Sequence, residues 1–263
     1  TTIQSMSCPT STLELVDSTQ APEDFHADSA RVYENFISEE EGKALVGDVL
    51  ARMRRKRFEH GHWDAVITEY KEVEIPIPSD SQMFQFGSSS QTVPSPESCA
   101  AIERVRRHIY QMHFHDDSES GSDVDWLPCH AIHLKKDGHL TAHVDSIKFS
   151  GDIVAGISLL SSSIMRLKPA SPGELAQANY TEGLSIYDIN RYPEENSPKT
   201  TCSGNGKSLE NAGNIDLYLP PLSLYILSGV SRYHYTHELL PSGSIFGPKQ
   251  KCVLRDDRIS IIF

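Results

Sequence analysis

The chain of 263 residues has few cysteines, no long hydrophobic run and no excess of positive charge. Its five cysteines are odd in number and scattered, with no Cys-x-x-Cys, which argues against a disulfide scaffold or a thiolate zinc site and suits a reducing compartment. No apolar run approaches the roughly 18 residues that a membrane span needs. The first basic residue is Arg31, so we expect neither a secretory signal nor an Arg-rich transit peptide within this chain.

Acidic residues outnumber basic ones, 36 to 24, and give a net charge of −12. This charge opposes a phosphate backbone over long range, so the sequence argues against a protein that coats duplex DNA. One local basic run occurs, from Arg52 to Arg57. It is interpreted as the solvated end of a helix, with a nucleic-acid or partner patch as the alternative.

Composition also indicates how the chain is divided. Hydrophobic residues make up 38% of it, which leaves room for one core and long polar loops. Residues 1–29 are Ser/Thr-rich and aperiodic and are predicted to form a flexible arm. We expect residues 30–263 to form a single domain, interrupted by a long loop insertion at 169–214 that serves as a lid or is disordered.

Hydrophobic periodicity changes along the chain. Ser38 and Glu41 form a capping box that predicts a helix over 39–57, and Ser95-Pro96 predicts the start of a second helix. From Trp126 onward the period falls to two, and about seven short strands follow, which indicates a β-sandwich or open barrel. The fold class is therefore mainly β, with two helices packed outside.

The pattern His-x-Asp is the first candidate for a metal site. It occurs four times, at His26/Asp28, His62/Asp64, His115/Asp117 and His143/Asp145. On a strand, residues i and i+2 project from the same face and reach one ion together. Only His143 and Asp145 lie among β-patterned segments, so this pair is favoured.

An iron oxygenase needs two imidazoles and one carboxylate on one face of the metal. After Asp145 the sequence holds two histidines, His234 and His237. They differ by three residues and fall on opposite faces of a strand, so the spacing alone leaves both open.

The last strand places Arg258 and Ser260 on one face and Ile259, Ile261 and Phe263 on the other. An arginine in apolar surroundings is costly unless it meets an anion, and its fork suits a carboxylate. The alternative is a buried ion pair with one of the chain's own acids.

These residues together resemble a known family. The His-x-Asp pair, a distal histidine and a strand-borne arginine are similar to the AlkB-like branch of the Fe(II)/2-oxoglutarate dioxygenases. The similarity is carried by HVDSIKFSGDIVAGISLLSSSIMRL (143–167), SLYILSGVSRYHYTHELL (223–240), DRISIIF (257–263) and RRKRFEHGHWDA (54–65). The resemblance implies a double-stranded β-helix, or jelly roll.

The resemblance also implies roles for individual residues. His143, Asp145 and His237 would be the iron ligands, with His234 a neighbour. Arg258 would hold the distal carboxylate of 2-oxoglutarate, with Ser260 nearby and Tyr225 donating a hydrogen bond. Without the resemblance, Tyr225 reads as an ordinary half-buried strand tyrosine.

The implied activity is hydroxylation of a C–H bond with Fe(II), 2-oxoglutarate and O2, giving succinate and CO2. We expect the substrate to be a methylated RNA base, with a protein side chain or a small metabolite as alternatives, and a monomer is favoured. Trp63, Tyr70, Phe84 and Phe86 are candidates for stacking a base. The resemblance implies a mitochondrial location, otherwise a cytoplasmic one. The alternative function is a non-catalytic jelly-roll module that binds metal or a protein partner.

Overall fold

The computed structural model describes residues 12–22, 25–61, 66–76, 94–114, 124, 126–146, 150–178 and 213–263. Its first sheet has six strands, in the spatial order β2 (Ala30–Tyr33), β8 (Ser223–Leu227), β5 (Val154–Leu159), β12 (Arg258–Ile262), β4 (Cys129–Leu134) and β3 (Tyr70–Ile75). Its second sheet has four, in the order β1 (Val16–Asp17), β7 (Ile215–Leu219), β6 (Ser163–Pro169) and β9 (Tyr235–Leu239). Strands β10 (Ser244–Phe246) and β11 (Lys251–Val253) form a separate hairpin.

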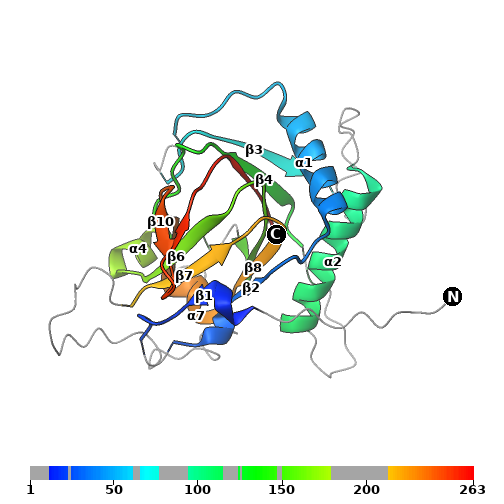
Figure 1. The fold of residues 1–263 in the computed structure, drawn as a ribbon. Helices are drawn as coiled ribbons and strands as arrows, with labels where there is room; N and C mark the ends of the chain where they lie inside the picture. The colour runs from blue at the N-terminus through cyan, green and yellow to red at the C-terminus, as the bar shows by residue number, and fades with distance from the viewer. Residues whose placement is uncertain are drawn as a thin grey trace.

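Two long helices lie side by side against one face of the six-stranded sheet (Figure 1). They are α1 (Glu39–Met53) and α2 (Pro96–His113), and a bidentate ion pair between Arg104 and Glu41 joins them. The short helices are α4 (Pro172–Gln177) and α7 (Gly229–Tyr233), with 3-10 turns η1 (Leu13–Leu15) and η2 (Ala27–Ser29). No helix in the described ranges is both long and apolar enough to span a membrane.

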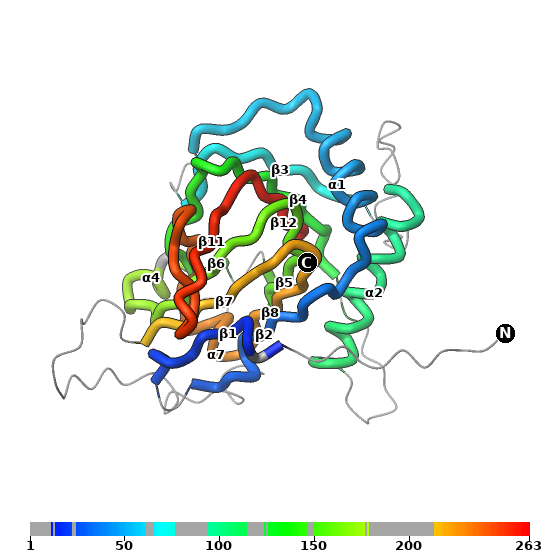
Figure 2. Tube along the Cα trace, viewed as in Figure 1, coloured from blue at the N-terminus to red at the C-terminus, as the bar shows by residue number. Residues whose placement is uncertain are grey.

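Strand alternation sorts side chains between two cores. On β12, Ile259 and Ile261 pack toward the helices, whereas Arg258 and Ser260 face the second sheet. The first core fills the space between the helices and the large sheet, and the second fills the space between the two sheets. Figure 2 shows the chain passing from β5 in the six-stranded sheet to β6 and β7 in the four-stranded sheet, and then back to β8. The fold is mainly β with flanking helices, a double-stranded β-helix, as the sequence predicts.

The helix starts agree with the sequence, and one helix end does not. Ser38 Oγ accepts from the Glu41 amide, and the Glu41 carboxylate accepts from the Ser38 amide at 2.8 Å, which completes the capping box. Ser95 caps α2 with Pro96 in its first turn. The first helix ends at Met53, however, and not at 57, so the basic residues that follow it lie exposed outside the helix.

Part of the predicted flexible arm is folded. Strand β1 pairs with β7, with Val16 opposite Leu217, and the side chain of Leu15 is buried. The polar stretch between the two long helices also contains an unexpected strand, β3, at the edge of the large sheet. Within the 169–214 insertion the structure describes α4 and its flanks, and residues 179–212 lie outside the described ranges.

Candidate active site

Of the four His-x-Asp pairs, the structure describes two, and these two lie in different surroundings. His143 and Asp145 lie in the segment between β4 and β5 and line a cavity of about 470 Å³ between the two sheets. His26 and Asp28 are exposed at η2, where Asp28 forms an ion pair of 3.0 Å with Arg31. His62/Asp64 and His115/Asp117 fall outside the described residues.

Backbone hydrogen bonds bring the first pair to a distant histidine. The segment that holds His143 runs antiparallel to β9, and the Leu239 amide donates to the Leu140 carbonyl at 3.0 Å. His143 and His237 exchange two further backbone hydrogen bonds, of 3.2 and 2.8 Å. The two residues are therefore cross-strand partners, and their rings lie 4.2 Å apart between centroids.

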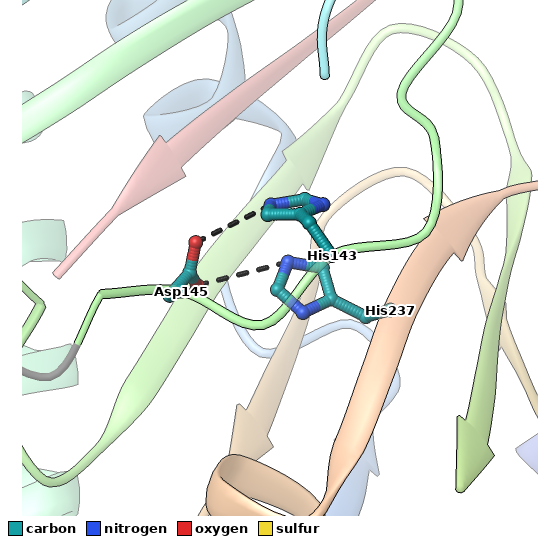
Figure 3. A group of neighbouring side chains, drawn as sticks. All are labelled: His143, Asp145 and His237. Atoms are coloured by element: carbon teal, nitrogen blue, oxygen red, sulfur yellow. Dashed lines mark ion pairs between the residues drawn. The ribbon is translucent and has the colours of Figure 1, made fainter. Parts of the chain in front are cut away.

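The side chains of His143, Asp145 and His237 converge (Figure 3). His143 Nε2 lies 3.3 Å from Asp145 Oδ1, and His237 Nε2 lies 3.6 Å from Asp145 Oδ2. Adjacent ligands of an octahedral ion with bonds of about 2.1 Å are about 3 Å apart, so these donors fit one metal ion. His143 Nδ1 donates to the Thr141 carbonyl at 2.8 Å, so Nε2 is the ring nitrogen that would bind the metal.

The charges of these groups suit metal binding. Burial lowers the pKa of His237 to about 4, so its imidazole is neutral at pH 7. Burial alone would raise the pKa of Asp145, but His237, His143 and Arg232 outweigh it and hold that pKa well below its usual range. A carboxylate and a neutral imidazole are the ligand forms that a metal ion requires.

His234, the other histidine that the sequence leaves open, does not join this group. It caps the end of α7, and its carbonyl accepts from the Ala170 amide at 2.8 Å. Within the described residues, the group able to hold a metal contains His237 and not His234.

Arg258 lies in the same cavity and is 3% exposed. One guanidinium nitrogen donates to Ser158 Oγ at 3.3 Å, and its Nε has no hydrogen-bond partner among the described residues. No acid of the described residues pairs with it, so the expected alternative of a buried ion pair is not found. Burial lowers the pKa of Arg258 only to about 10, so the cavity holds a cation with no acid of the described residues within ion-pair distance.

Tyr225 and Ser260 line the cavity beside Arg258. Burial raises the pKa of the Tyr225 hydroxyl, which therefore stays protonated and available as a donor. Together the three side chains offer a guanidinium fork and two hydroxyls, a set that suits a carboxylate.

Several residues of this site are not predicted from the sequence. Gly156 lies next to Tyr225, and Ser158 lies next to Arg258. The period-two pattern of the segment that contains Gly156 and Ser158 predicts a strand but no role in a site. Glu72 and His130 form a pair of 2.9 Å in the cavity wall; Glu72 lies on β3, a strand that the sequence does not predict.

Of the residues predicted to stack a base, Tyr70 is part of the core. It is 3% exposed, and its hydroxyl donates to Glu59 at 3.1 Å, so that role is wrong for Tyr70. Trp63, Phe84 and Phe86 lie outside the described residues.

Two curated proteins are similar to most of the chain. The mitochondrial alpha-ketoglutarate-dependent dioxygenase alkB homolog 7 of Mus musculus is 31% identical over 237 residues, which cover 89% of this chain and 77% of that protein. Its counterpart in Bos taurus is 30% identical over the same shares. No family model matches the chain.

Solved structures similar to the chain include a Pseudomonas putida prolyl-4-hydroxylase and OsALKBH1. The first has a TM-score of 0.46 and 13% identity, over 89% of this chain and 90% of that one. The second has a TM-score of 0.43 and 13% identity, over 89% and 96%. The extent of the similarity to the two curated relatives shows that the chain belongs to the alkB homolog 7 family of Fe(II)- and 2-oxoglutarate-dependent dioxygenases.

Proposed function

We propose that the chain hydroxylates a C–H bond of a bound substrate while converting 2-oxoglutarate and O2 to succinate and CO2. One oxygen atom enters succinate and the other enters the substrate. The observation that carries this proposal is that the ligand triad shares one cavity with a buried arginine that has no acid partner among the described residues. His143, Asp145 and His237 would hold Fe(II), and Arg258, Tyr225 and Ser260 would hold 2-oxoglutarate.

Fe(II), when bound, supplies the activation of O2. The protein groups bind and orient the other reactants. Arg258 and the Tyr225 hydroxyl would hold the distal carboxylate of 2-oxoglutarate, and the triad would bind its keto-acid end through the metal. The remaining wall is largely apolar and limits water around the reacting groups; it includes Ile132, Leu134, Leu140, Val154, Met165 and Leu239.

For the substrate, the surroundings of β3 support an N-methylated RNA base. Arg54, Arg55, Lys56 and Arg57 are exposed, and Lys56 Nζ donates to the Glu72 carbonyl at 2.7 Å. The basic run thus lies beside a strand whose Glu72 lines the cavity. Cations at that place suit phosphates outside the cavity while one base enters it.

A protein side chain is the second candidate. The net charge of −12 disfavours a polyanion, and the Glu72 carboxylate in the cavity wall suits a substrate group that donates hydrogen bonds. The RNA base and the protein side chain would undergo the same hydroxylation. They differ in the part of the substrate that stays outside the cavity, which is a phosphate backbone or a polypeptide.

The activity is tested by succinate formation from 2-oxoglutarate with Fe(II), first without added substrate. Asp145→Ala removes the carboxylate ligand and is expected to abolish succinate formation. The matched control Asp28→Ala removes an exposed His-x-Asp aspartate and is expected to retain it. Full turnover by Asp145→Ala would overturn the metal assignment, and no turnover by the unmodified chain would favour the non-catalytic module.

The substrate class is tested with single-stranded RNA and with peptides. Binding to RNA that weakens steeply with salt, and that falls when Arg54, Arg55 and Arg57 are replaced by serine, supports the RNA base. Binding and turnover of peptides with no response to RNA would select the protein side chain. The family name of the relatives supports a mitochondrial location, which imaging of the tagged full-length protein would test.

A further inference from the structure

A buried arginine from a short helix contacts the backbone of the residue that carries the candidate metal carboxylate. Arg232 lies in α7 and is 2% exposed. Its guanidinium donates to three backbone carbonyls, those of Asp145 at 3.0 Å, Gly151 at 3.2 Å and Ser146 at 3.4 Å. A single side chain thus contacts both ends of the stretch from Asp145 to Gly151.

These carbonyls belong to the connection between β4 and β5, outside the strand ladders of the described residues. Gly151 has a φ of +64°, a left-handed conformation that turns the chain just before β5. Tyr233, the neighbour of Arg232 in α7, donates from its hydroxyl to Asp152 Oδ1 at 2.7 Å. Helix α7 therefore contacts this connection on both sides of the turn at Gly151.

The segment that contains α7 also carries His237, another candidate ligand of the metal. Helix α7 continues almost directly into β9, where His237 lies five residues after Arg232. His143 is fixed to His237 by backbone hydrogen bonds, whereas Asp145 lies beyond that ladder. Of the three ligands, Asp145 is the one whose backbone depends on the arginine.

We infer that Arg232 is a positioning residue for metal binding: its planar fork fixes the backbone at Asp145 so that the carboxylate faces both imidazoles before a metal arrives. The inference rests on the proposed function, because it takes the triad as the metal site. The contacts of Arg232 also bear on the cavity, since Ser150, next to Gly151, lines its wall. Outer partners that orient metal ligands are worth about 10- to 100-fold in metal affinity.

The test measures Mn²⁺ affinity of the 263-residue chain from the electron paramagnetic resonance signal of free Mn²⁺, an ion that serves in place of Fe(II). Arg232→Met is expected to weaken Mn²⁺ binding about 10- to 100-fold. Arg232→Lys keeps the charge, but its single ammonium cannot span three carbonyls, so we expect an intermediate loss.

A matched control separates positioning from folding. Arg255 is 6% exposed and donates to the carbonyls of Lys135 and Gly138, in a loop that carries no residue of the triad. Arg255→Met is expected to lower the melting temperature as Arg232→Met does, but to keep the native Mn²⁺ affinity. An equal loss of affinity in both variants would overturn the inference.

The remaining outcomes are also decisive. If Arg232→Met does not fold, Arg232→Lys decides, and native Mn²⁺ affinity in that variant overturns the inference. Native affinity in a folded Arg232→Met overturns it too and leaves the metal centre standing. Failure of the unmodified chain to bind Mn²⁺ would remove the metal centre, and the inference with it.

Discussion

The ring of Tyr225 lies directly across Gly156, its partner on the neighbouring strand. A Cβ atom at position 156 would be 2.6 Å from Cε1, Cζ and the hydroxyl oxygen of that ring. Since such a distance is a clash, the glycine is what allows the tyrosine to reach the cavity beside Arg258. The proposed 2-oxoglutarate site thus depends on the absence of a side chain at Gly156.

Gly156→Ala should therefore displace Tyr225 and raise the KM for 2-oxoglutarate. Loss of one hydrogen bond to a carboxylate corresponds to about tenfold or more. Gly47→Ala is the matched control, because Gly47 is exposed in α1 and a Cβ added there would have no atom of the described residues within 4 Å. That variant should keep the KM and gain up to about 1 kcal/mol of stability. Succinate formation against 2-oxoglutarate concentration checks both, and an unchanged KM in Gly156→Ala would contradict the role of Tyr225.

Arg258→Met should separate stability from cosubstrate binding. The native guanidinium is buried with no acid of the described residues beside it, so its removal is expected to leave the free energy of unfolding equal or higher. The same change should abolish the rise in melting temperature that 2-oxoglutarate gives the native chain. Arg258→Lys keeps a charge without the fork and should raise the KM about tenfold. Thermal unfolding with and without 2-oxoglutarate distinguishes these results from a structural role.

His108 should make the fold sensitive to acid. It is 3% exposed and packs against Tyr33 and Phe36, and burial, aided by the charge of Arg31, lowers its pKa. Because the folded state favours the neutral ring, the contribution of His108 is complete above the unfolded pKa of about 6.5 and is lost as the pH falls below it.

His108→Phe keeps the ring packing and removes the titration. Between pH 7.5 and 5.5 the native chain should lose about 1 kcal/mol more stability than the variant, as measured by urea unfolding. Identical pH dependence in the two proteins would show that His108 does not drive this loss.

Asp216 should matter more for stability than most surface acids. Its two oxygens each accept from Arg166 at 2.7 Å, and the two side chains are 11% and 21% exposed. Asp216→Asn breaks this bidentate pair across β6 and β7 and should cost about 1 to 3 kcal/mol. Lys43→Met, which removes an exposed pair with Glu39, should cost under about 0.5 kcal/mol, and a similar cost for both would contradict the prediction.

Local signals in the sequence predict much of the fold. The capping box at Ser38 and the Ser95-Pro96 pair locate two helix starts, because caps depend on residues close in sequence. The end of α1 is not signalled, since no glycine follows Met53 and arginine and lysine are good helix formers. Strand β3 escapes prediction because its buried residues Tyr70, Val73 and Ile75 do not keep a strict period of two, and charged side chains fill the positions between them.

In the candidate site, too, the sequence predicts the residues that are close along the chain and not those that depend on long-range contacts. His143 and Asp145 lie two residues apart, so their proximity follows from strand geometry. The choice of His237 over His234 depends on which residue pairs with His143 across the sheets, and spacing does not determine that register. Arg232 and Gly156 act through contacts with residues far along the chain, which no local pattern reveals.

The two backbone hydrogen bonds between His143 and His237 bear on how this site changes over evolutionary time. Every residue type except proline has a main-chain N–H and C=O, so these two hydrogen bonds do not require the imidazole side chains at the two positions. Conservative substitutions in the packing around the site should therefore leave the separation of the two imidazoles unchanged. Substitution should be tolerated least at the buried residues of β9 and at the few side chains that position a backbone by themselves, such as Arg232 at Asp145.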